Sequence, residues 1–176
     1  MTFLESLSPE RVKRFTAQDL VLLAAEMRQF LIETVSRTGG HIGANLGVVE
    51  LTIALHYVFD SPRDCLVFDT GHQGYAHKLL TGRQGLFHTL NQWGGMNRFL
   101  TRQESEHDII DATHAGTSLS IASGIAWARR LAGSPHPVVA VIGDGSMVEG
   151  LAFEGLNFVA GSGLPSVGVL NDRSTR

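Results

Sequence analysis

The most constraining stretch of this sequence lies near its C-terminal end, where two apolar runs flank a helix-like segment. Residues 138–142 (VVAVI) form a continuous apolar run between Pro137 and Gly143, which is typical of a buried strand. A helical pattern follows at about 148–160, and a second run, which we also expect to be buried, covers 167–170. Two parallel strands joined by a helix form a βαβ unit. The stretch therefore predicts an α/β fold with a parallel sheet.

Polar residues follow both of these predicted strands. Asp144 stands between two glycines after the first strand, and Asn171 comes 27 positions later, after the second. Parallel sheets bind their ligands at the carboxyl ends of the strands, and carboxylate and amide oxygens suit Mg²⁺ or Ca²⁺. Glycines allow backbone amides to approach an anion closely. The pattern predicts a metal-bridged diphosphate held between neighbouring strand ends, with Asp144 and Asn171 on the metal side.

The first third of the chain is predicted to be helical. Thr16 and Asp19 predict a capping box for an amphipathic helix whose apolar residues recur from 20 to 35 and which ends near Gly39. A second helix is expected at 48–59. We expect its buried face to contain three apolar positions: Leu51, Leu55 and either Val58 or Phe59.

The middle of the chain alternates between the two kinds of element. A buried strand is expected at 65–68 and a helix at 75–80, and 85–99 is expected to be irregular with one short helix. A long helix opens at 113–118 and runs to Leu131. This alternation predicts a doubly wound α/β fold, a mainly parallel sheet with helices on both faces.

Composition excludes several classes of protein. The chain has 176 residues, 43% hydrophobic and 18% charged, as in a single globular domain. A net charge of −3 without a basic patch argues against nucleic-acid binding. The apolar runs are too short to span a bilayer, and the N-terminus lacks a signal peptide's apolar segment. Cys65 is the only cysteine; we expect a buried structural thiol in a cytoplasmic protein.

Three histidines occupy similar places in the sequence. His41, His72 and His114 are each flanked by glycine or small residues at a loop-to-helix transition, and we expect all three on one rim of the sheet. Histidine can bind phosphate, orient a carbonyl substrate or transfer protons near neutral pH. Their spacing does not fit a zinc site. We expect the remaining histidines to be structural or on the surface: His56, His77, His88, His107 and His136.

Longer motifs around these residues carry a family resemblance. Residues 36–51 read SRTGGHIGANLGVVEL, residues 69–78 read DTGHQGYAHK, and Arg102 precedes Glu104 and Glu106. In these segments, and over about residues 10–172, the chain resembles the N-terminal domain of the 1-deoxy-D-xylulose-5-phosphate synthase family. The Gly-Asp-Gly stretch followed by asparagine is also the layout of the thiamine diphosphate motif.

The resemblance implies a thiamine diphosphate-binding domain of the transketolase type. In that family, pyruvate is joined to glyceraldehyde 3-phosphate with loss of CO₂, and the thiazolium ring of the cofactor serves as the electron sink. The resemblance makes Asp144 a Mg²⁺ ligand and places Gly145 and Ser146 against the diphosphate. His72 and the segment Thr113, His114 and Ala115 would line the cofactor, and His41 would face the substrate.

The chain departs from the family pattern at two positions. The family has serine where this chain has Ala115, so a hydroxyl contact is lost. Its second asparagine, the usual metal ligand, is replaced by Arg173, which cannot bind a cation. Asn171 remains as a substitute ligand.

A third departure concerns length. Enzymes of the family continue into a pyrimidine-binding domain whose glutamate activates the cofactor. We therefore expect residues 1–176 to form a single diphosphate-binding domain, incomplete at its C-terminus and inactive alone. It would work in a homo- or hetero-oligomer with a pyrimidine-binding domain or second subunit, on a keto acid and an aldehyde or sugar phosphate. An exposed apolar face should mark the docking surface.

Three readings of the sequence stay open. The first is half of an enzyme, either a synthase or a transketolase-like subunit with another acceptor. The second is a non-catalytic relative that has lost metal binding through Arg173 and serves as an interaction subunit. The third is an unrelated anion-binding α/β protein, although the glycine-rich loops of nucleotide binders are missing.

Overall fold

The computed structural model describes residues 2–111 and 113–172. The chain divides into two compact units, and it passes from one to the other three times. The first unit comprises Met1–Asp60 and His72–Phe99, and the second comprises Ser61–Gly71 and Leu100–Arg176. The prediction of one diphosphate-binding domain concerns the chain as a whole and stays a prediction.

The first unit is built on the long helix α2 (Ala17–Thr38). The Thr16 hydroxyl accepts the N–H of Asp19, whose carboxylate accepts the N–H of Thr16, so the predicted capping box is confirmed. The helix ends at Gly39, whose φ of 75° suits glycine. Its buried face contains most of the predicted apolar residues, whereas Leu20 and Phe30 are only partly buried. Each large buried side chain contributes about 1.5–3 kcal/mol by leaving water. The buried residues are Leu23, Ala24, Met27, Leu31 and Val35.

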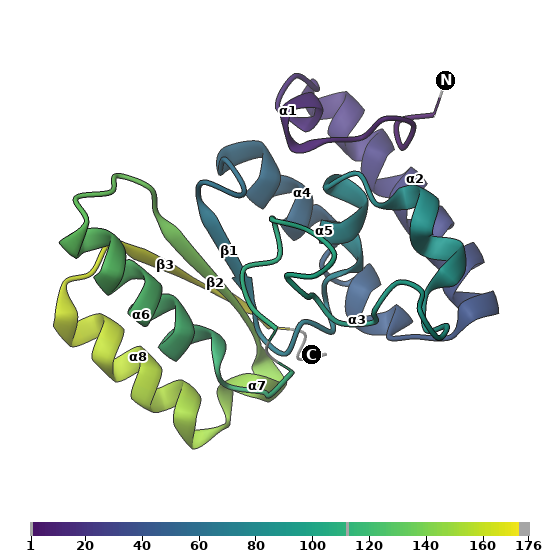
Figure 1. Cartoon of the computed structure of the whole chain (residues 1–176). Coiled ribbons are helices and arrows are strands. Elements are labelled where there is room, and N and C mark those ends of the chain that lie inside the picture. The colour runs from purple at the N-terminus through teal and green to yellow at the C-terminus, as the bar shows by residue number, and fades with distance from the viewer. Residues whose placement is uncertain (1, 112, 173–176) are drawn as a thin grey trace. The chain divides into compact units, whose positions relative to one another are not determined.

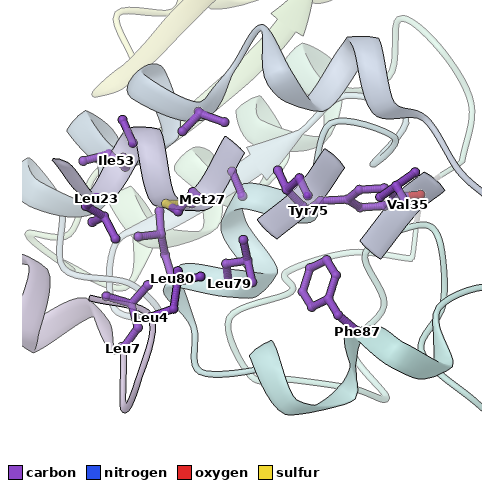
Figure 2. Packing of buried hydrophobic residues seen from close by; sticks show 14 of the residues in the cluster. Leu4, Leu7, Leu23, Met27, Val35, Ile53, Tyr75, Leu79, Leu80 and Phe87 are labelled. Carbon is purple, nitrogen blue, oxygen red and sulfur yellow. The ribbon is translucent and has the colours of Figure 1, made fainter. Parts of the chain in front are cut away.

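Shorter helices pack against α2 or, for α1, against α4, and complete the apolar core of this unit (Figures 1 and 2). They are α1 (Pro9–Val12), α3 (Ile42–Leu46), α4 (Val49–Val58), α5 (Tyr75–Leu80) and the 3₁₀ helix η1 (Gln84–Thr89). Met27 of α2 and Leu80 of α5 are fully buried in this core, as are Tyr75 and Phe87. The helices predicted at 48–59 and 75–80 are confirmed, whereas α1 and α3 are too short to show a period in the sequence.

The predicted buried face of α4 is confirmed only at Leu55; Leu51 and Phe59 are half-buried. The helix buries Val49, Thr52, Ile53, Leu55 and His56, whereas Val58 is 68% exposed. Thr52 is tolerated inside because its hydroxyl donates to the carbonyl of Val48 at 2.7 Å. The helix is apolar on nearly every side, so the sequence pattern did not reveal which side faces inward.

The second unit contains the parallel sheet. Its strands are β1 (Cys65–Phe68), β2 (Val138–Gly143) and β3 (Ser166–Asn171), in the order β1-β2-β3. Every residue of β1 and β2 is buried, as their continuous apolar runs predict. The α/β class and the parallel βαβ unit are confirmed.

β3 departs from the expected burial. Val167 and Leu170 are 42% and 55% exposed, so the prediction of a buried run is wrong. Pairing at the edge of the sheet is not the reason, because among the described residues β1 also pairs only with β2 and is fully buried. The side chains of β1 are covered by packed elements, whereas half of the β3 residues are exposed. An apolar run in the sequence indicates a strand but not whether a neighbour covers it.

Two helices lie side by side on one side of this sheet (Figure 1). They are α6 (Ser118–Leu131), which packs against β2, and α8 (Gly150–Ser162), which follows the short α7 (Asp144–Met147). Gly155 permits the close approach of α8 to α6, because a Cβ there would lie 2.9 Å from the backbone nitrogen of Ser120. The long helices agree with the sequence-based expectation.

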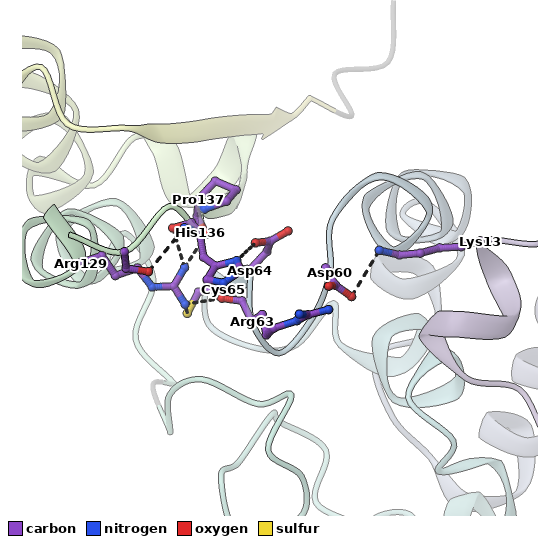
Figure 3. Close-up of polar contacts among 9 residues, drawn as sticks. Lys13, Asp60, Arg63, Asp64, Cys65, Arg129, His136 and Pro137 are labelled. Atoms are coloured by element: carbon purple, nitrogen blue, oxygen red, sulfur yellow. Dashed lines mark hydrogen bonds and ion pairs between the residues drawn. The ribbon is translucent and has the colours of Figure 1, made fainter. Parts of the chain in front are cut away.

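Arg129 of α6 anchors the beginning of the sheet (Figure 3). Its guanidinium donates to the carbonyls of His136 and Pro137, just before β2, at 2.8 and 2.7 Å, and to the Cys65 sulfur at 2.9 Å. Burial raises the pKa of the Cys65 thiol, and the nearby Arg129 opposes this only in part. The prediction of a buried structural thiol is confirmed.

Within residues 2–111 and 113–172, no helix combines the length and the apolarity needed to cross a bilayer.

Candidate functional site

The predicted site residues are divided between the two units. His41 and His72 belong to the first unit. The others belong to the second unit: Thr113, His114, Ala115, Asp144, Gly145, Ser146 and Asn171. Two of the three histidines that we expect on one rim, His41 and His72, thus lie in the same unit. That His114 shares this rim stays a prediction.

His41 and His72 lie together in the first unit although 31 residues separate them in sequence. Their ring centroids are 5.8 Å apart, with an edge-to-face angle of 74°. His41 is exposed at the start of α3, and the Phe99 ring lies 5.9 Å from it. His72 is half-buried in the segment that leads into α5. The pair presents two imidazoles to the same small volume.

The backbone of His41 is held from both sides. Its N–H donates to the Tyr75 hydroxyl at 3.4 Å, and its carbonyl accepts from the Asn45 amide at 2.8 Å. Its φ and ψ of −90° and 66° belong to neither a regular helix nor a strand. Gly40 before it has φ 143°, and a Cβ there would lie 2.5 Å from the Tyr75 hydroxyl. Only glycine allows this close approach.

Tyr75 is fully buried at the start of α5. Desolvation raises the pKa of its phenol, and the hydrogen bond from the His41 N–H opposes this to a smaller degree. The hydroxyl therefore stays protonated near neutral pH and serves here as an acceptor.

Asp69 is the main anchor in the second unit. It follows β1, is 2% exposed, and accepts the N–H of Gly116 at 2.9 Å and that of Ser118 at 3.0 Å, one on each carboxylate oxygen. These N–H groups belong to the turn before α6 and to its first residue. The segment 113–115 just before them is exposed. Asp69 thus fixes the end of the loop that carries Thr113, His114 and Ala115.

Sequence reasoning did not single out Asp69. An acidic residue directly after a buried strand was a usable signal, because such strand ends carry ligands or anchor neighbouring loops. The partners of this carboxylate lie 47 and 49 residues away, and nothing in the sequence identifies them.

The ends of β2 and β3 carry the predicted metal ligands. The two strands are parallel, and Gly143 pairs in register with Asn171. Asp144 follows Gly143 directly, is half-buried and begins α7; Gly145 is exposed and Ser146 buried. The structure thus places Asp144 and Asn171 at the ends of neighbouring strands, and their role as ligands stays a prediction.

The donor set at these strand ends is small. No group of three His, Cys, Asp or Glu side chains that could hold a metal occurs among the described residues. Asp144 and Asn171 would supply a carboxylate and an amide oxygen, which Mg²⁺ accepts together with water and phosphate oxygens. The Nδ2 atom of Asn171 is buried without a hydrogen-bond partner in the described part of the chain. Arg173 lies outside the described residues.

The other histidines make hydrogen bonds that agree with structural roles. His56 and His77 are fully buried, with ring nitrogens 2.9 Å apart. His136 pairs with Asp64 at 3.1 Å, as Figure 3 shows. His107 bonds the Ser61 hydroxyl at 3.0 Å, and His88 bonds the carbonyl of Gly85 at 2.8 Å.

Fold and site together define an α/β protein whose parallel strands end in oxygen-bearing side chains, with a histidine pair held in a helical unit. Comparison with known proteins makes this class specific. The family model described as 1-deoxy-D-xylulose-5-phosphate synthase matches residues 4–176. The chain belongs to the 1-deoxy-D-xylulose-5-phosphate synthase family, which confirms the resemblance in the sequence and sets aside an unrelated anion-binding protein.

Curated relatives of the chain are proteins of the same family. The chain is 55% identical over 165 residues to 1-deoxy-D-xylulose-5-phosphate synthase of Acidobacterium capsulatum, covering 94% of this chain and 26% of that protein. It is 54% identical over 172 residues to 1-deoxy-D-xylulose-5-phosphate synthase 1 of Geobacter sulfurreducens, covering 97% and 27%. It is 53% identical over 174 residues to 1-deoxy-D-xylulose-5-phosphate synthase of Saccharopolyspora erythraea, covering 98% and 27%. The chain spans about a quarter of the length of these relatives.

Proposed function

We propose that this chain provides the diphosphate-binding part of a thiamine diphosphate-dependent 1-deoxy-D-xylulose-5-phosphate synthase. Such an enzyme joins pyruvate to glyceraldehyde 3-phosphate with loss of CO₂. Membership of the family implies the cofactor. The observation that carries the proposal is the parallel register of β2 and β3, in which Gly143 lies opposite Asn171.

The residues at these strand ends fit a metal-bound diphosphate. Asp144 and Asn171 would hold Mg²⁺ through hard oxygen donors. The buried Nδ2 of Asn171, which has no partner among the described residues, supports a ligand at this edge. Gly145 is exposed, so its backbone is open to a phosphate group. When bound, thiamine diphosphate supplies the electron sink for decarboxylation of a keto acid.

The histidines supply proton-transfer and orienting groups. His41 and His72 present two imidazoles, which can donate to or accept from a substrate oxygen near neutral pH. The exposed segment Thr113, His114 and Ala115 would contact the cofactor, with its end fixed by Asp69. In this proposal His41 and His72 are the catalytic residues of the chain.

A partner is part of the proposal. The pyrimidine-binding domain, on the same or a second chain, would complete a cytoplasmic homo- or hetero-oligomer. Exposed large apolar side chains in the second unit support docking there, since a partner would remove them from water. They are Leu151, Phe153, Leu156 and Phe158 of α8 and Val167 and Leu170 of β3.

Calorimetric titration tests the proposal. Thiamine diphosphate is titrated, with and without Mg²⁺, into the chain combined with the pyrimidine-binding part of a curated relative. We expect Mg²⁺-dependent binding that Asp144→Asn weakens at least about tenfold, since one charged metal ligand is lost. The control Glu33→Gln removes one negative charge from an exposed site on α2 and should leave affinity unchanged. No binding in the reconstituted complex would overturn the proposal.

Arg173 favours a second candidate function. Arginine stands where the family has its metal-binding asparagine, which is the change expected in a non-catalytic interaction subunit. Arg173→Asn separates the two candidates. Cofactor binding by the variant but not by the native chain supports the non-catalytic subunit, whereas equal binding by both leaves the synthase proposal in place.

A further inference from the structure

Asn45 joins the two segments that carry the histidine pair. It lies in α3, is 0% exposed, and makes three hydrogen bonds of 2.8 Å. Its Nδ2 donates to the carbonyl of His41 and to the carbonyl of His72, which lies 27 residues away. Its Oδ1 accepts the N–H of Tyr75. One side chain therefore contacts the backbone of both histidines and the first residue of α5.

The chemistry of the amide matches this task. An asparagine NH₂ group has two hydrogens, one for each carbonyl, and its oxygen accepts the N–H of Tyr75. Rotating the amide by half a turn would set its oxygen against both carbonyls and its NH₂ against an N–H, so the network fixes its orientation. A carboxylate of the same size has no hydrogen to donate and would face two carbonyl oxygens.

Tyr75 closes the arrangement. Its backbone N–H is held by Asn45, and its hydroxyl accepts the N–H of His41 at 3.4 Å. Both peptide groups flanking the Cα of His41 are thus tied, directly or through Tyr75, to the Asn45 amide. His41 is exposed as a residue, and the rings found near its imidazole are those of His72 and Phe99, so its position depends strongly on its backbone.

We propose that Asn45 is a positioning residue that sets the spacing of the His41 and His72 imidazoles. The claim that these imidazoles contact a substrate rests on the proposed function, whereas the positioning of the two rings by Asn45 does not. Asn45 itself touches no reacting atom in this arrangement. Its effect passes through two backbone carbonyls, and it couples the two motifs that identify the family.

The experiment compares histidine signals in the ¹³C,¹⁵N-histidine-labelled chain. Asn45→Asp keeps the size and the acceptor but loses both donors. Thr52→Val is the matched control, because Thr52 is equally buried and its hydroxyl bonds the carbonyl of Val48, the residue before α4. We expect Asn45→Asp to shift or broaden the ring signals of His41 and His72, to abolish the NOE between the two rings, and to leave His88 and His136 unchanged. Thr52→Val should change none of these signals.

A second variant and a native-state measurement cover the case in which Asn45→Asp fails to fold. Asn45→Ser keeps one donor and should give smaller shifts at the same two histidines. In the native chain, both Nδ2 protons of Asn45 should exchange with solvent far more slowly than those of Asn157, which is exposed on α8. Signals of His41 and His72 that do not move in a folded Asn45 variant, or fast exchange of the Asn45 amide protons, would overturn the proposal.

The reconstituted enzyme provides a separate readout. Misplacing a reacting group by about 1 Å costs about 10²-fold in rate, so Asn45→Ser should lower kcat far more than it weakens the affinity for thiamine diphosphate. If the complex does not bind the cofactor, the proposed function fails while the NMR result still decides the role of Asn45. If it binds but the histidine signals do not move, only the role of Asn45 is lost.

Discussion

The two units hold their candidate site segments by opposite hydrogen-bond chemistry. In the first unit the neutral amide of Asn45 donates to two backbone carbonyls. In the second unit the carboxylate of Asp69 accepts two backbone N–H groups. Both side chains are almost fully buried, at 0% and 2% exposed. The backbone groups that face each side chain determine which residue can serve: carbonyls need a donor, and N–H groups need an acceptor.

The largest loss of stability is expected when the carboxylate of Asp69 is removed. Asp69→Ala leaves the buried N–H groups of Gly116 and Ser118 without their acceptor. Each such loss costs about 1–3 kcal/mol, so the free energy of unfolding should fall by about 3–5 kcal/mol in urea titration. Asp69→Asn keeps one acceptor oxygen and should cost about 2 kcal/mol. A loss below about 0.5 kcal/mol in Asp69→Ala would show that the anchor is dispensable.

A smaller effect is expected at Gly40 in the first unit. Gly40→Ala would place a Cβ 2.5 Å from the Tyr75 hydroxyl at φ 143°, and strain of this kind costs about 1–3 kcal/mol. Gly43→Ala is the control, because nothing lies within 4 Å of its added Cβ and alanine favours helix α3. Thermal unfolding should rank Gly40→Ala below native and Gly43→Ala at or above it. Adding Tyr75→Phe should recover part of the loss in Gly40→Ala, and equal stability of the two single variants would contradict the clash.

Cys65 begins β1, the strand that Asp69 follows, and its thiol reports on the burial of that end. Its pKa is raised by burial, so the folded state favours the thiol. The corresponding stability is fully present below the unfolded pKa of about 8.5 and is lost as pH rises through the folded pKa. We expect unfolding temperatures to fall above about pH 8.5 and Cys65→Ala to lessen that fall. Alkylation by iodoacetamide at pH 8 should be at least about 10²-fold slower in the native than in the unfolded chain.

The smallest effect is expected at Asp111, an exposed counterpart of Asp69. Its carboxylate accepts from Arg102 Nε, from the Thr101 hydroxyl and from the Arg102 N–H, each at 2.8 Å, and these bonds, that of the Arg102 side chain first, lower its pKa. A lowered pKa stabilises the fold above about pH 3.9, and the effect is lost as pH falls through the folded value. Because both side chains are exposed, water screens the attraction between Asp111 and Arg102, and the effect on stability is small.

Hydrogen exchange measures this local contact. Asp111→Asn should speed exchange of the Arg102 N–H, whereas Glu106→Gln, at a nearby exposed carboxylate, should not. An Asp111 carboxyl that titrates at or above about pH 3.9 by NMR would contradict the lowered pKa.

The sequence predicted the regular elements well and their surroundings less well. The capping box at Thr16 and the buried runs of β1 and β2 depend on neighbours in sequence, and the structure has them as predicted. The buried side of α4 and the exposure of β3 depend on which elements pack nearby, which the local pattern does not contain.

The same limit applies to the candidate site. The sequence singled out His41 and His72 by their glycine-rich surroundings and Asp144 and Asn171 by their place after strands. It did not single out Asn45 or Asp69. Their roles arise from hydrogen bonds to residues 27 to 49 positions away, and such partners become visible only when the chain has folded.

Because the two units alternate along the chain, they complete their folding at different times during synthesis. The last segment of the first unit ends at Phe99, so that unit can fold while the rest is still being synthesised, since domains generally fold as units during synthesis. β1 is made early, but its partner β2 begins only at Val138. At about 5–20 residues per second, this buried strand waits for seconds without its neighbour. A ribosome stalled shortly before Val138 should therefore carry a folded helical unit and a β1 strand without its partner.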